Sequence, residues 1–362
     1  MTPVVKYFAK ISNPSPIPKF EYFQGMKRKH FLQGIIPAAF SIQAIAASSA
    51  GPKKKFRIPP YLQAGDTIGI TAPAGYIEMK TLEPALQRLD DWGFKVQLGK
   101  SVGTGQFSFS ASDKIRKEDF QSMLDQPEIK AILCARGGYG AVRIIDDIDF
   151  SRFSKHPKWI IGFSDITVFH AHINSKLRIA TLHSKMCNSF PSDWNLADDL
   201  RKATINSIYD CLTGKRMQYQ AESSVMNKPG TAVGEIVGGN LRTIETLAGT
   251  ASDYDTTDKI LFVEDTGEYL YSIDRMFWNL KRSGKLSRLK GLIVGGFKEK
   301  KEEPDERFGK TLEEIVLEKT KAYDYPVCFN FPVGHQVNNF ALKCGVVHRL
   351  EVQNSKTILT QL

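Results

Sequence analysis

An alternation of strand-like and helical segments between about residues 63 and 190 is the feature that most constrains this fold. The apolar, strand-like segments are DTIGITAPAG (66–75), FKVQLG (94–99), IKAILCAR (129–136) and KWIIGFS (158–164). The helical segments between and after them cover residues 81–93, 112–127, 141–149 and 165–176. Strands separated by helices pair in parallel and carry helices on both faces. We therefore expect an N-terminal α/β domain of the Rossmann or flavodoxin-like kind over residues 56–190.

The pattern changes after about residue 190. Residues 191–215 have the character of a connecting helical segment. Shorter apolar segments then follow: GTAVGEIVGGN (230–240), KILFVEDTGE (259–268), KGLIVGGF (290–297), PVCFNFPVG (326–334) and GVVHRLEVQ (345–353). Two helical segments, 272–284 and 311–324, interrupt them. This arrangement predicts a second, mixed α/β domain over residues 216–362.

The basic charge is concentrated at the start of the chain. The formal net charge is +10, and residues 1–50 hold six Lys/Arg and one acid, so they contribute +5. The other 312 residues carry the remaining +5. This charge is too small to predict a nucleic-acid-binding protein, so we expect no nucleic-acid partner.

Residues 1–50 are interpreted as an export signal region. From Met26 the sequence has a basic start, an apolar stretch over residues 34–46, and small residues at Ala44 and Ala46. RKHFLQ (28–33) is similar to a twin-arginine signal, with lysine at the second arginine position. The apolar stretch is too short to span a bilayer. We expect translation to start at Met26 and the protein to be exported or periplasmic, without a membrane span; a cytoplasmic location is the alternative.

The cysteines give no sign of a metal site or a disulfide framework. There are five, at positions 134, 187, 211, 328 and 344. Their number is odd and no two of them are separated by two residues. We therefore expect no metal and no cofactor.

Three strand ends carry small or polar residues: APAG (72–75), ARGGYG (135–140) and GFSD (162–165). In a parallel sheet, loops at the carboxyl ends of the strands form the ligand site. A dinucleotide fingerprint would require glycine at position 143, where the chain has Arg143. The glycine turn is therefore either an oxyanion hole made of backbone N–H groups or only a tight turn.

Ser164 in GFSD is either a nucleophile on a sharp strand-to-helix turn or the N-cap of the next helix. A nucleophile needs a base. His335, in the loop FPVGHQVNN, fits that role better than His170 or His172 on the following helical segment. Glu264, or Asp265 beside it, could supply the carboxylate that orients the imidazole.

The sequence resembles the LD-carboxypeptidases of serine peptidase family S66, which also includes the microcin C immunity peptidases. The resemblance runs from about Ile58 to Glu351 in a single order. It rests on PPYLQAGDTIGITAPAG, AILCARGGYGAVRIID, IIGFSDIT, GGNLRTIETLAGT, ILFVEDTGEYLYSIDRMFWNL and FPVGHQVNNFALKCG. Relatives often have an HGP-like segment where this chain has LHSKMCNSF (182–190), a region expected to line the substrate site.

The resemblance implies a catalytic triad of Ser164, Glu264 and His335 in a cleft between the domains. It also implies an oxyanion hole formed by the backbone N–H groups of Gly138 and Asp165. The implied substrate is a murein tetrapeptide that loses its terminal D-alanine, and the implied assembly is a homodimer. A carboxypeptidase must also bind a free terminal carboxylate, and Arg136 or Arg143 could do so as bidentate donors. The alternatives are cleavage of a peptidyl-nucleotide antibiotic in self-immunity and non-catalytic binding of muropeptides.

Overall fold

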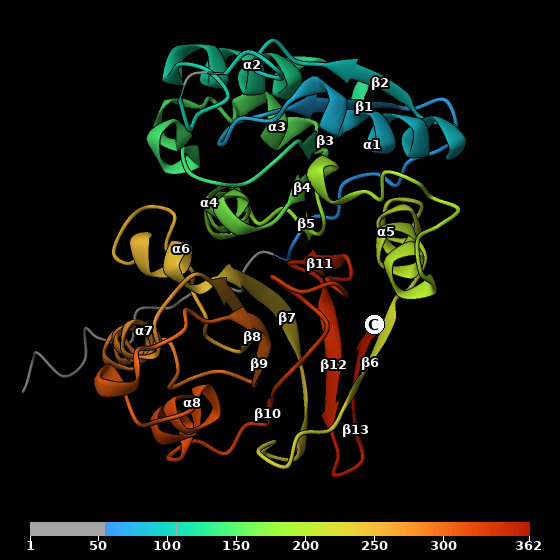
Figure 1. The fold of residues 1–362 in the computed structure, drawn as a ribbon. Helices are drawn as coiled ribbons and strands as arrows, with labels where there is room; N and C mark the ends of the chain where they lie inside the picture. Colours follow the sequence, from blue (N-terminus) through green and yellow to red (C-terminus); the bar gives the residue numbers. More distant parts are fainter. Residues whose placement is uncertain (1–54, 106) are drawn as a thin grey trace, which may run out of the picture. The chain divides into compact units, whose positions relative to one another are not determined.

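The computed structural model describes residues 55–105 and 107–362, which form two β-sheets with their helices (Figure 1). The export signal predicted for residues 1–50 lies outside the described residues. Among the helices that the structure describes, none has the length and apolar character needed to cross a membrane.

The first sheet contains the parallel strands predicted for the N-terminal half. Five strands pair in parallel, and a sixth is antiparallel at one edge. The order is β11 (Leu342–Cys344), β5 (Thr181–His183), β4 (Trp159–Gly162), β3 (Ile129–Cys134), β1 (Thr67–Thr71) and β2 (Lys95–Leu98). The edge strand β11 comes from the C-terminal half of the sequence, so the chain returns to the first sheet after completing most of the second.

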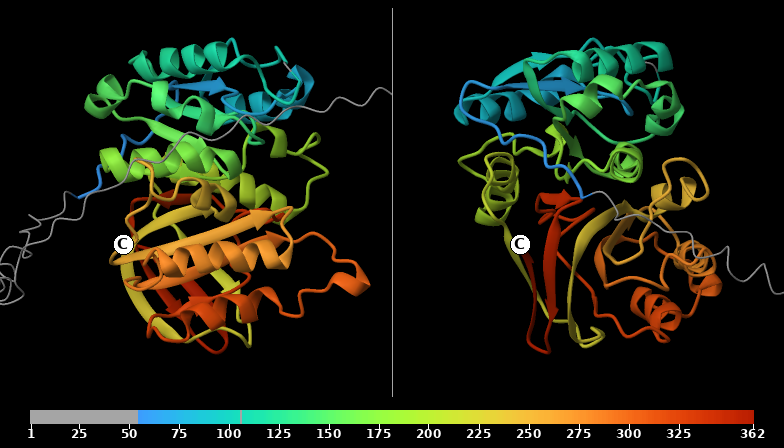
Figure 2. Two further views of the ribbon diagram at one scale, coloured as in Figure 1. Left: turned by 90° about the vertical axis from the view of Figure 1, so that its left-hand side faces the viewer. Right: turned by 180° about the vertical axis from the view of Figure 1, so that it is seen from behind.

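Helices cover both faces of this sheet, as the alternating pattern predicts (Figures 1 and 2). Helices α1 (Met79–Asp91) and α5 (Asp199–Leu212) share one apolar core with Ile68, Ile70 and Leu133. A second core contains α2 (Asp113–Asp125), α3 (Ser151–Lys155) and α4 (Thr167–His172), together with Ile132 and Ile160. Consecutive strand residues point to opposite faces, which is why both faces of the sheet are apolar.

The helix predicted over residues 141–149 is not formed. The segment makes two short 3-10 turns, Ala141–Arg143 and Ile145–Asp147, before α3 begins. The side chain of Gln121 forms hydrogen bonds with both backbone groups of Asp149. It accepts from the N–H at 2.8 Å and donates to the carbonyl at 2.9 Å. These groups would otherwise continue a helix, so the tertiary contact replaces the local one.

The second sheet is mixed, as predicted. Its order is β10 (Val327–Cys328), β9 (Gly291–Lys298), β8 (Lys259–Thr266), β7 (Gly230–Asn240), β12 (Val347–Val352), β13 (Lys356–Gln361) and β6 (Gln218–Glu222). The first four strands are parallel, and the last three join antiparallel. Helices α6 (Leu241–Thr246), α7 (Leu270–Arg282) and α8 (Leu312–Thr320) pack on one face, where Ile244, Ile273 and Ile315 are buried.

The carboxyl end of β7 meets the turn that follows β4. The backbone N–H of Asn240, the last residue of β7, donates to the side-chain oxygen of Thr167 at 3.1 Å. Asn240 is also the register partner of Glu264 on β8. The strand ends of the two sheets therefore bring the segments that carry Ser164 and Glu264 together.

Candidate active site

Ser164 lies on a sharp turn directly after β4. Its φ angle is 62°, in the left-handed region that non-glycine residues rarely adopt. Its side chain caps neither the 3-10 turn Ser164–Ile166, whose N-cap is Phe163, nor α4, whose N-cap is Ile166. The capping role that the sequence left open is therefore not formed. A strained residue of this kind at a strand end is typical of a functional position.

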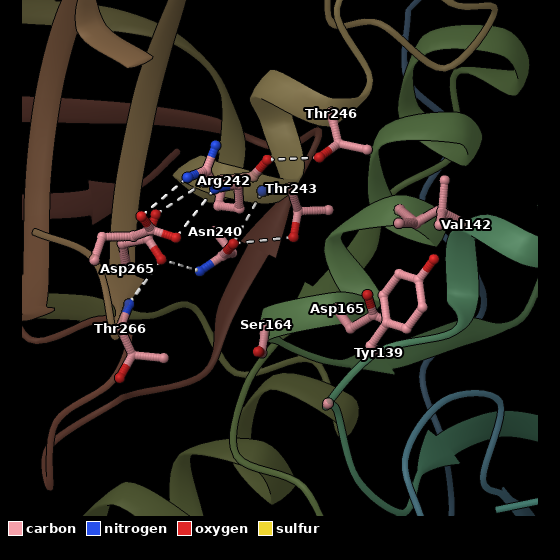
Figure 3. A pocket seen from close by; sticks show the side chains of 13 residues that line it. Tyr139, Val142, Ser164, Asp165, Asn240, Arg242, Thr243, Thr246, Asp265 and Thr266 are labelled. Atoms are coloured by element: carbon pink, nitrogen blue, oxygen red, sulfur yellow. Dashed lines mark hydrogen bonds and ion pairs between the residues drawn. The ribbon is translucent and has the colours of Figure 1, made fainter. Parts of the chain in front are cut away.

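Ser164 lines a cavity of about 240 Å³ between the ends of the two sheets (Figure 3). The part of the wall that belongs to the first sheet is Gly138, Tyr139, Val142, Ser164, Asp165 and Val168. The other part is Asn240, Arg242, Thr243, Thr246, Asp265, Thr266 and Glu268. A ligand bound here would contact the serine hydroxyl and polar groups of both sheets.

His335 and Glu264 form a direct contact. The imidazole Nδ1 lies 2.5 Å from Oε2 of Glu264. Glu264 belongs to β8, and its side chain is fully buried. The neighbouring Gly334 has φ 102°, and a Cβ built there would lie 2.3 Å from the Cβ of Glu264. Glycine is thus required for the loop to approach the strand closely enough to form the contact. When Nδ1 carries the proton and donates it to the buried carboxylate, Nε2 is unprotonated and can act as the base.

The loop of His335 also contacts the segment of Ser164. The ring of Phe163, which precedes Ser164, lies 4.9 Å from the ring of His335 between centroids. Together with the bond between Thr167 and Asn240, this contact brings the segments of all three predicted catalytic residues to one place. The pairing of histidine and carboxylate is the part of the predicted triad that is formed directly.

The glycine turn and the serine turn each leave one backbone N–H group unused at the cavity that Ser164 lines. Gly138 has φ 102°, and the turn is tied to the loop after β1 by the bond from Gly75 N–H to the Gly137 carbonyl, at 2.8 Å. Among the described residues, the N–H groups of Gly138 and Asp165 donate no hydrogen bond to the protein. Free backbone donors beside a serine are the geometry that an oxyanion hole needs.

The Asp165 side chain holds the end of the glycine turn by a hydrogen bond. Its Oδ2 accepts the N–H of Ala141 at 2.8 Å. Burial raises the pKa of this carboxyl to about 6, against the lowering effect of the bond from Ala141. Asp165 therefore has one structural role through its carboxylate and one candidate catalytic role through its backbone.

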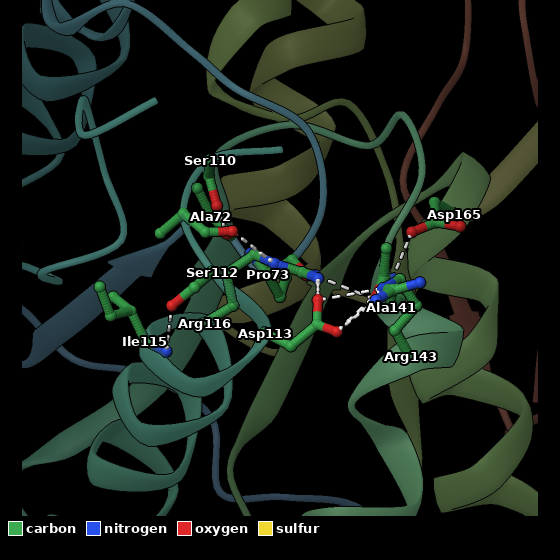
Figure 4. Close-up of polar contacts among 12 residues, drawn as sticks. Ala72, Pro73, Ser110, Ser112, Asp113, Ile115, Arg116, Ala141, Arg143 and Asp165 are labelled. Carbon is green, nitrogen blue, oxygen red and sulfur yellow. Dashed lines mark hydrogen bonds and ion pairs between the residues drawn. The ribbon is translucent and has the colours of Figure 1, made fainter. Parts of the chain in front are cut away.

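Arg116 joins the loops from the other side, although nothing in the sequence predicted this (Figure 4). Arg116 belongs to α2, and its side chain is fully buried. Its guanidinium donates to the carbonyls of Pro73, Ala111 and Gly140, the last at 2.9 Å, and forms an ion pair with Asp113. One cation thus holds the loops after β1 and β3 in register.

Replacing Arg116 with methionine is expected to lower the free energy of unfolding by roughly 3–5 kcal/mol, because buried carbonyls lose their donor. Urea unfolding of the purified variant measures this change. The control is Arg152→Met on the exposed part of α3, which should stay within about 0.5 kcal/mol of the wild type. A loss below about 1 kcal/mol for Arg116→Met would contradict the assigned role.

The second-sheet wall of the cavity is acidic. Burial, together with the neighbouring Glu264 carboxylate, raises the pKa of Asp265 to about 6, against the lowering effect of the hydrogen bonds that it accepts. Asp265 accepts from the Asn240 side chain and from the N–H of Arg242, both at 2.9 Å. Glu268 is held by two bonds of 3.0 Å from the guanidinium of Arg242. Both carboxylates are therefore fixed in position at the cavity wall.

The two arginines predicted as carboxylate receptors do not line this cavity, and of the predicted triad only Ser164 lines it, while His335 and Glu264 do not. The Arg143 guanidinium donates to both oxygens of Asp113, from Nη2 to Oδ2 at 2.6 Å and from Nε to Oδ1 at 3.1 Å. Arg136 donates to the carbonyl of Tyr76 at 2.7 Å. Asn240, Arg242 and Glu268 were not predicted as site residues; their signal was their place at or just after the ends of strand-like segments. Over residues 55–105 and 107–362 no group of three or more His, Cys, Asp or Glu side chains could hold a metal ion.

Comparisons with known proteins show the family to which both halves of the described chain belong. Residues 68–184 match the model of the LD-carboxypeptidase N-terminal domain, and residues 233–350 match that of the C-terminal domain. The chain is 36% identical over 292 residues to a probable murein peptide carboxypeptidase of Bacillus subtilis, an alignment covering 79% of this chain and 89% of that one.

Two further similar proteins are a carboxypeptidase of known structure and an immunity protein. The crystal structure of the muramoyltetrapeptide carboxypeptidase from Oxalobacter formigenes has a TM-score of 0.73 and 28% identity, and covers 82% of this chain and 98% of that one. The microcin C7 self-immunity protein of Escherichia coli is 25% identical over 334 residues, which is 83% of this chain and 94% of that protein.

Proposed function

Because the chain belongs to the LD-carboxypeptidase family, peptidase family S66, we propose that it is a serine-type carboxypeptidase that removes the terminal D-alanine from murein tetrapeptides. The observation that carries the proposal is the pairing of His335 with the buried Glu264, at 2.5 Å, beside the strained Ser164. The named relatives that act on murein peptides support the substrate class.

The reaction begins when Ser164 Oγ attacks the carbonyl of the third residue of the peptide. His335 Nε2 takes the hydroxyl proton, and Glu264 holds the imidazole by Nδ1 and stabilises its cationic form. The tetrahedral oxyanion is held by the N–H groups of Gly138 and Asp165. The C–N bond then breaks, and His335 gives its proton to the leaving D-alanine nitrogen.

Water completes the cycle. His335 removes a proton from the water, whose oxygen attacks the acyl-enzyme, and Ser164 leaves with that proton. The products are a tripeptide with a new carboxylate and free D-alanine. Each step uses side chains and backbone groups of the described residues, with the water as the second substrate.

The acidic cavity wall matches the charge of the third residue, which belongs to the part of the peptide that stays on the serine. The third residue of a murein peptide, diaminopimelate or lysine, carries an ammonium group at the end of its side chain. Asp265 and Glu268 are carboxylates on the wall of the cavity that Ser164 also lines, and Glu268 is already paired with Arg242. An ammonium group bound at this wall gains charge-assisted hydrogen bonds.

The test is mass spectrometry of a muramoyl-tetrapeptide after incubation with the purified full chain. The expected product has lost one D-alanine, and the matching pentapeptide, which ends in a D-D bond, should remain intact. Absence of D-alanine release, or cleavage at another bond, would contradict the proposal. A peptidyl-nucleotide offered in the same assay tests the self-immunity alternative, and preferential cleavage of it would favour that activity.

A further inference from the structure

Lys185 is a partly buried cation beside the catalytic histidine, and the proposed mechanism does not use it. It follows β5, and its ammonium Nζ donates to the carbonyl of Gln336 at 2.6 Å. Gln336 is the residue after His335. The ammonium also lies 5.8 Å from the centroid of the Phe163 ring, which packs against His335. Lys185 therefore contacts both the segment of His335 and the segment of Ser164.

The hydrogen bonding of Lys185 is incomplete compared with other buried lysines. Lys259 and Lys285 each form an ion pair with a carboxylate, at 3.3 and 2.7 Å. Lys158 and Lys343 have no such partner, but each donates to two neutral oxygens. Among the described residues Lys185 has one carbonyl partner and no paired carboxylate. An ammonium has three N–H donors, so two remain for a ligand.

The surroundings favour an anionic ligand at this position. Burial lowers the pKa of Lys185, and the attraction of the nearby Glu264 carboxylate acts in the opposite direction. The Glu264 carboxylate is already bound to His335. A partly desolvated ammonium gains most from a carboxylate that can reach it directly, because such a bond is stronger than one to a neutral oxygen.

The chemistry of the leaving group indicates where its carboxylate must lie. In D-alanine the nitrogen and the carboxylate carbon are two bonds apart, a distance of about 2.5 Å. His335 protonates that nitrogen. The receptor for the carboxylate therefore has to lie close to His335. The Lys185 ammonium bonds to the carbonyl of the next residue, Gln336, and lies over the Phe163 ring that packs against His335.

We propose that Lys185 is the specificity residue that binds the terminal carboxylate of the substrate and so makes this enzyme a carboxypeptidase. The inference rests on the proposed function, since it assumes a D-alanine leaving group. Lys185 thus takes the receptor role for which the sequence offered Arg143, whose guanidinium is already bound to Asp113. It also orients the substrate, with the terminal anion at Lys185 and the ammonium of the third residue at the acidic wall of Asp265 and Glu268.

The experiment compares two substrates, the tetrapeptide and the same peptide with a C-terminal D-alaninamide. The wild type is expected to prefer the free acid. Lys185→Gln keeps a donor for the Gln336 carbonyl but removes the charge, and kcat/KM for the acid should fall by about 10- to 100-fold. For the amide kcat/KM should change by less than about threefold. Lys185→Arg should retain most of the preference.

Two control variants distinguish the loss of one carboxylate receptor from the general loss of a buried or nearby cation. Lys158→Gln removes a buried lysine that bonds only to carbonyls, directly before β4, and should leave both substrates unaffected. Arg136→Gln tests the arginine predicted from the sequence, and loss of the acid preference in this variant instead would overturn the inference.

The outcomes distinguish the inference from the proposed function. An equal loss on acid and amide in Lys185→Gln would mean that Lys185 only supports the His335 loop, and would overturn the inference alone. A wild type that cleaves the tetrapeptide without preferring the acid would do the same. A wild type that releases D-alanine from neither substrate would refute the proposed function, and the inference with it.

Discussion

Ser164→Ala is expected to lower kcat for release of D-alanine by about a million-fold, because the attacking oxygen is removed. The φ of 62° at Ser164 and its position on the cavity wall indicate a hydroxyl that is held for reaction rather than for capping. The remaining activity would come from the oxyanion donors and substrate binding alone. Long incubations followed by mass spectrometry of the tetrapeptide measure the residual rate.

The control for this prediction is Ser283→Ala at the C-terminal end of α7, which should keep full activity. Labelling with a fluorophosphonate gives an independent readout, since the wild type should be modified once at Ser164 and the variant should not react. Equal D-alanine release by the wild type and Ser164→Ala would show that another group is the nucleophile.

The fold was predictable where the apolar pattern is long. Strands β1, β3, β4, β7 and β8 and helix α8 lie within segments recognised in the sequence, and β9 and α7 overlap such segments to within two residues at their ends. Strands β5 and β11 were missed because each has only three residues and pairs with a partner about 160 positions away. Helix α6 was missed because it is short and follows directly on the Gly-Gly-Asn end of β7.

The candidate site was predictable in its residue types but not in its contacts. Ser164, Glu264 and His335 stand at strand ends or in loops, where sequence patterns point to function. The roles of Arg116 and Lys185 depend on carbonyl groups from segments far away in the sequence, such as Gly140 and Gln336. A backbone carbonyl has no sequence signature, so such interactions become visible only in the structure.

The position of Glu264 leads to the second large effect. Its Oε2 meets His335 Nδ1 at 2.5 Å, and its other oxygen is buried without a partner in the described part of the chain. In Glu264→Gln the side-chain amide can donate to Nδ1, and the imidazole would then carry its proton on Nε2, the atom that must accept the serine proton. We expect kcat to fall by about 10⁴-fold with little change in KM.

Steady-state kinetics on the tetrapeptide measure this loss, and thermal unfolding checks that the isosteric variant is folded. Glu245→Gln is the matched control, because Glu245 binds Arg242 at 2.7 Å and has no contact with His335. It should retain kcat within about threefold. If Glu264→Gln kept more than about one tenth of the wild-type kcat while remaining folded, the carboxylate would only pack against the imidazole, and His335 would need another group to set its tautomer.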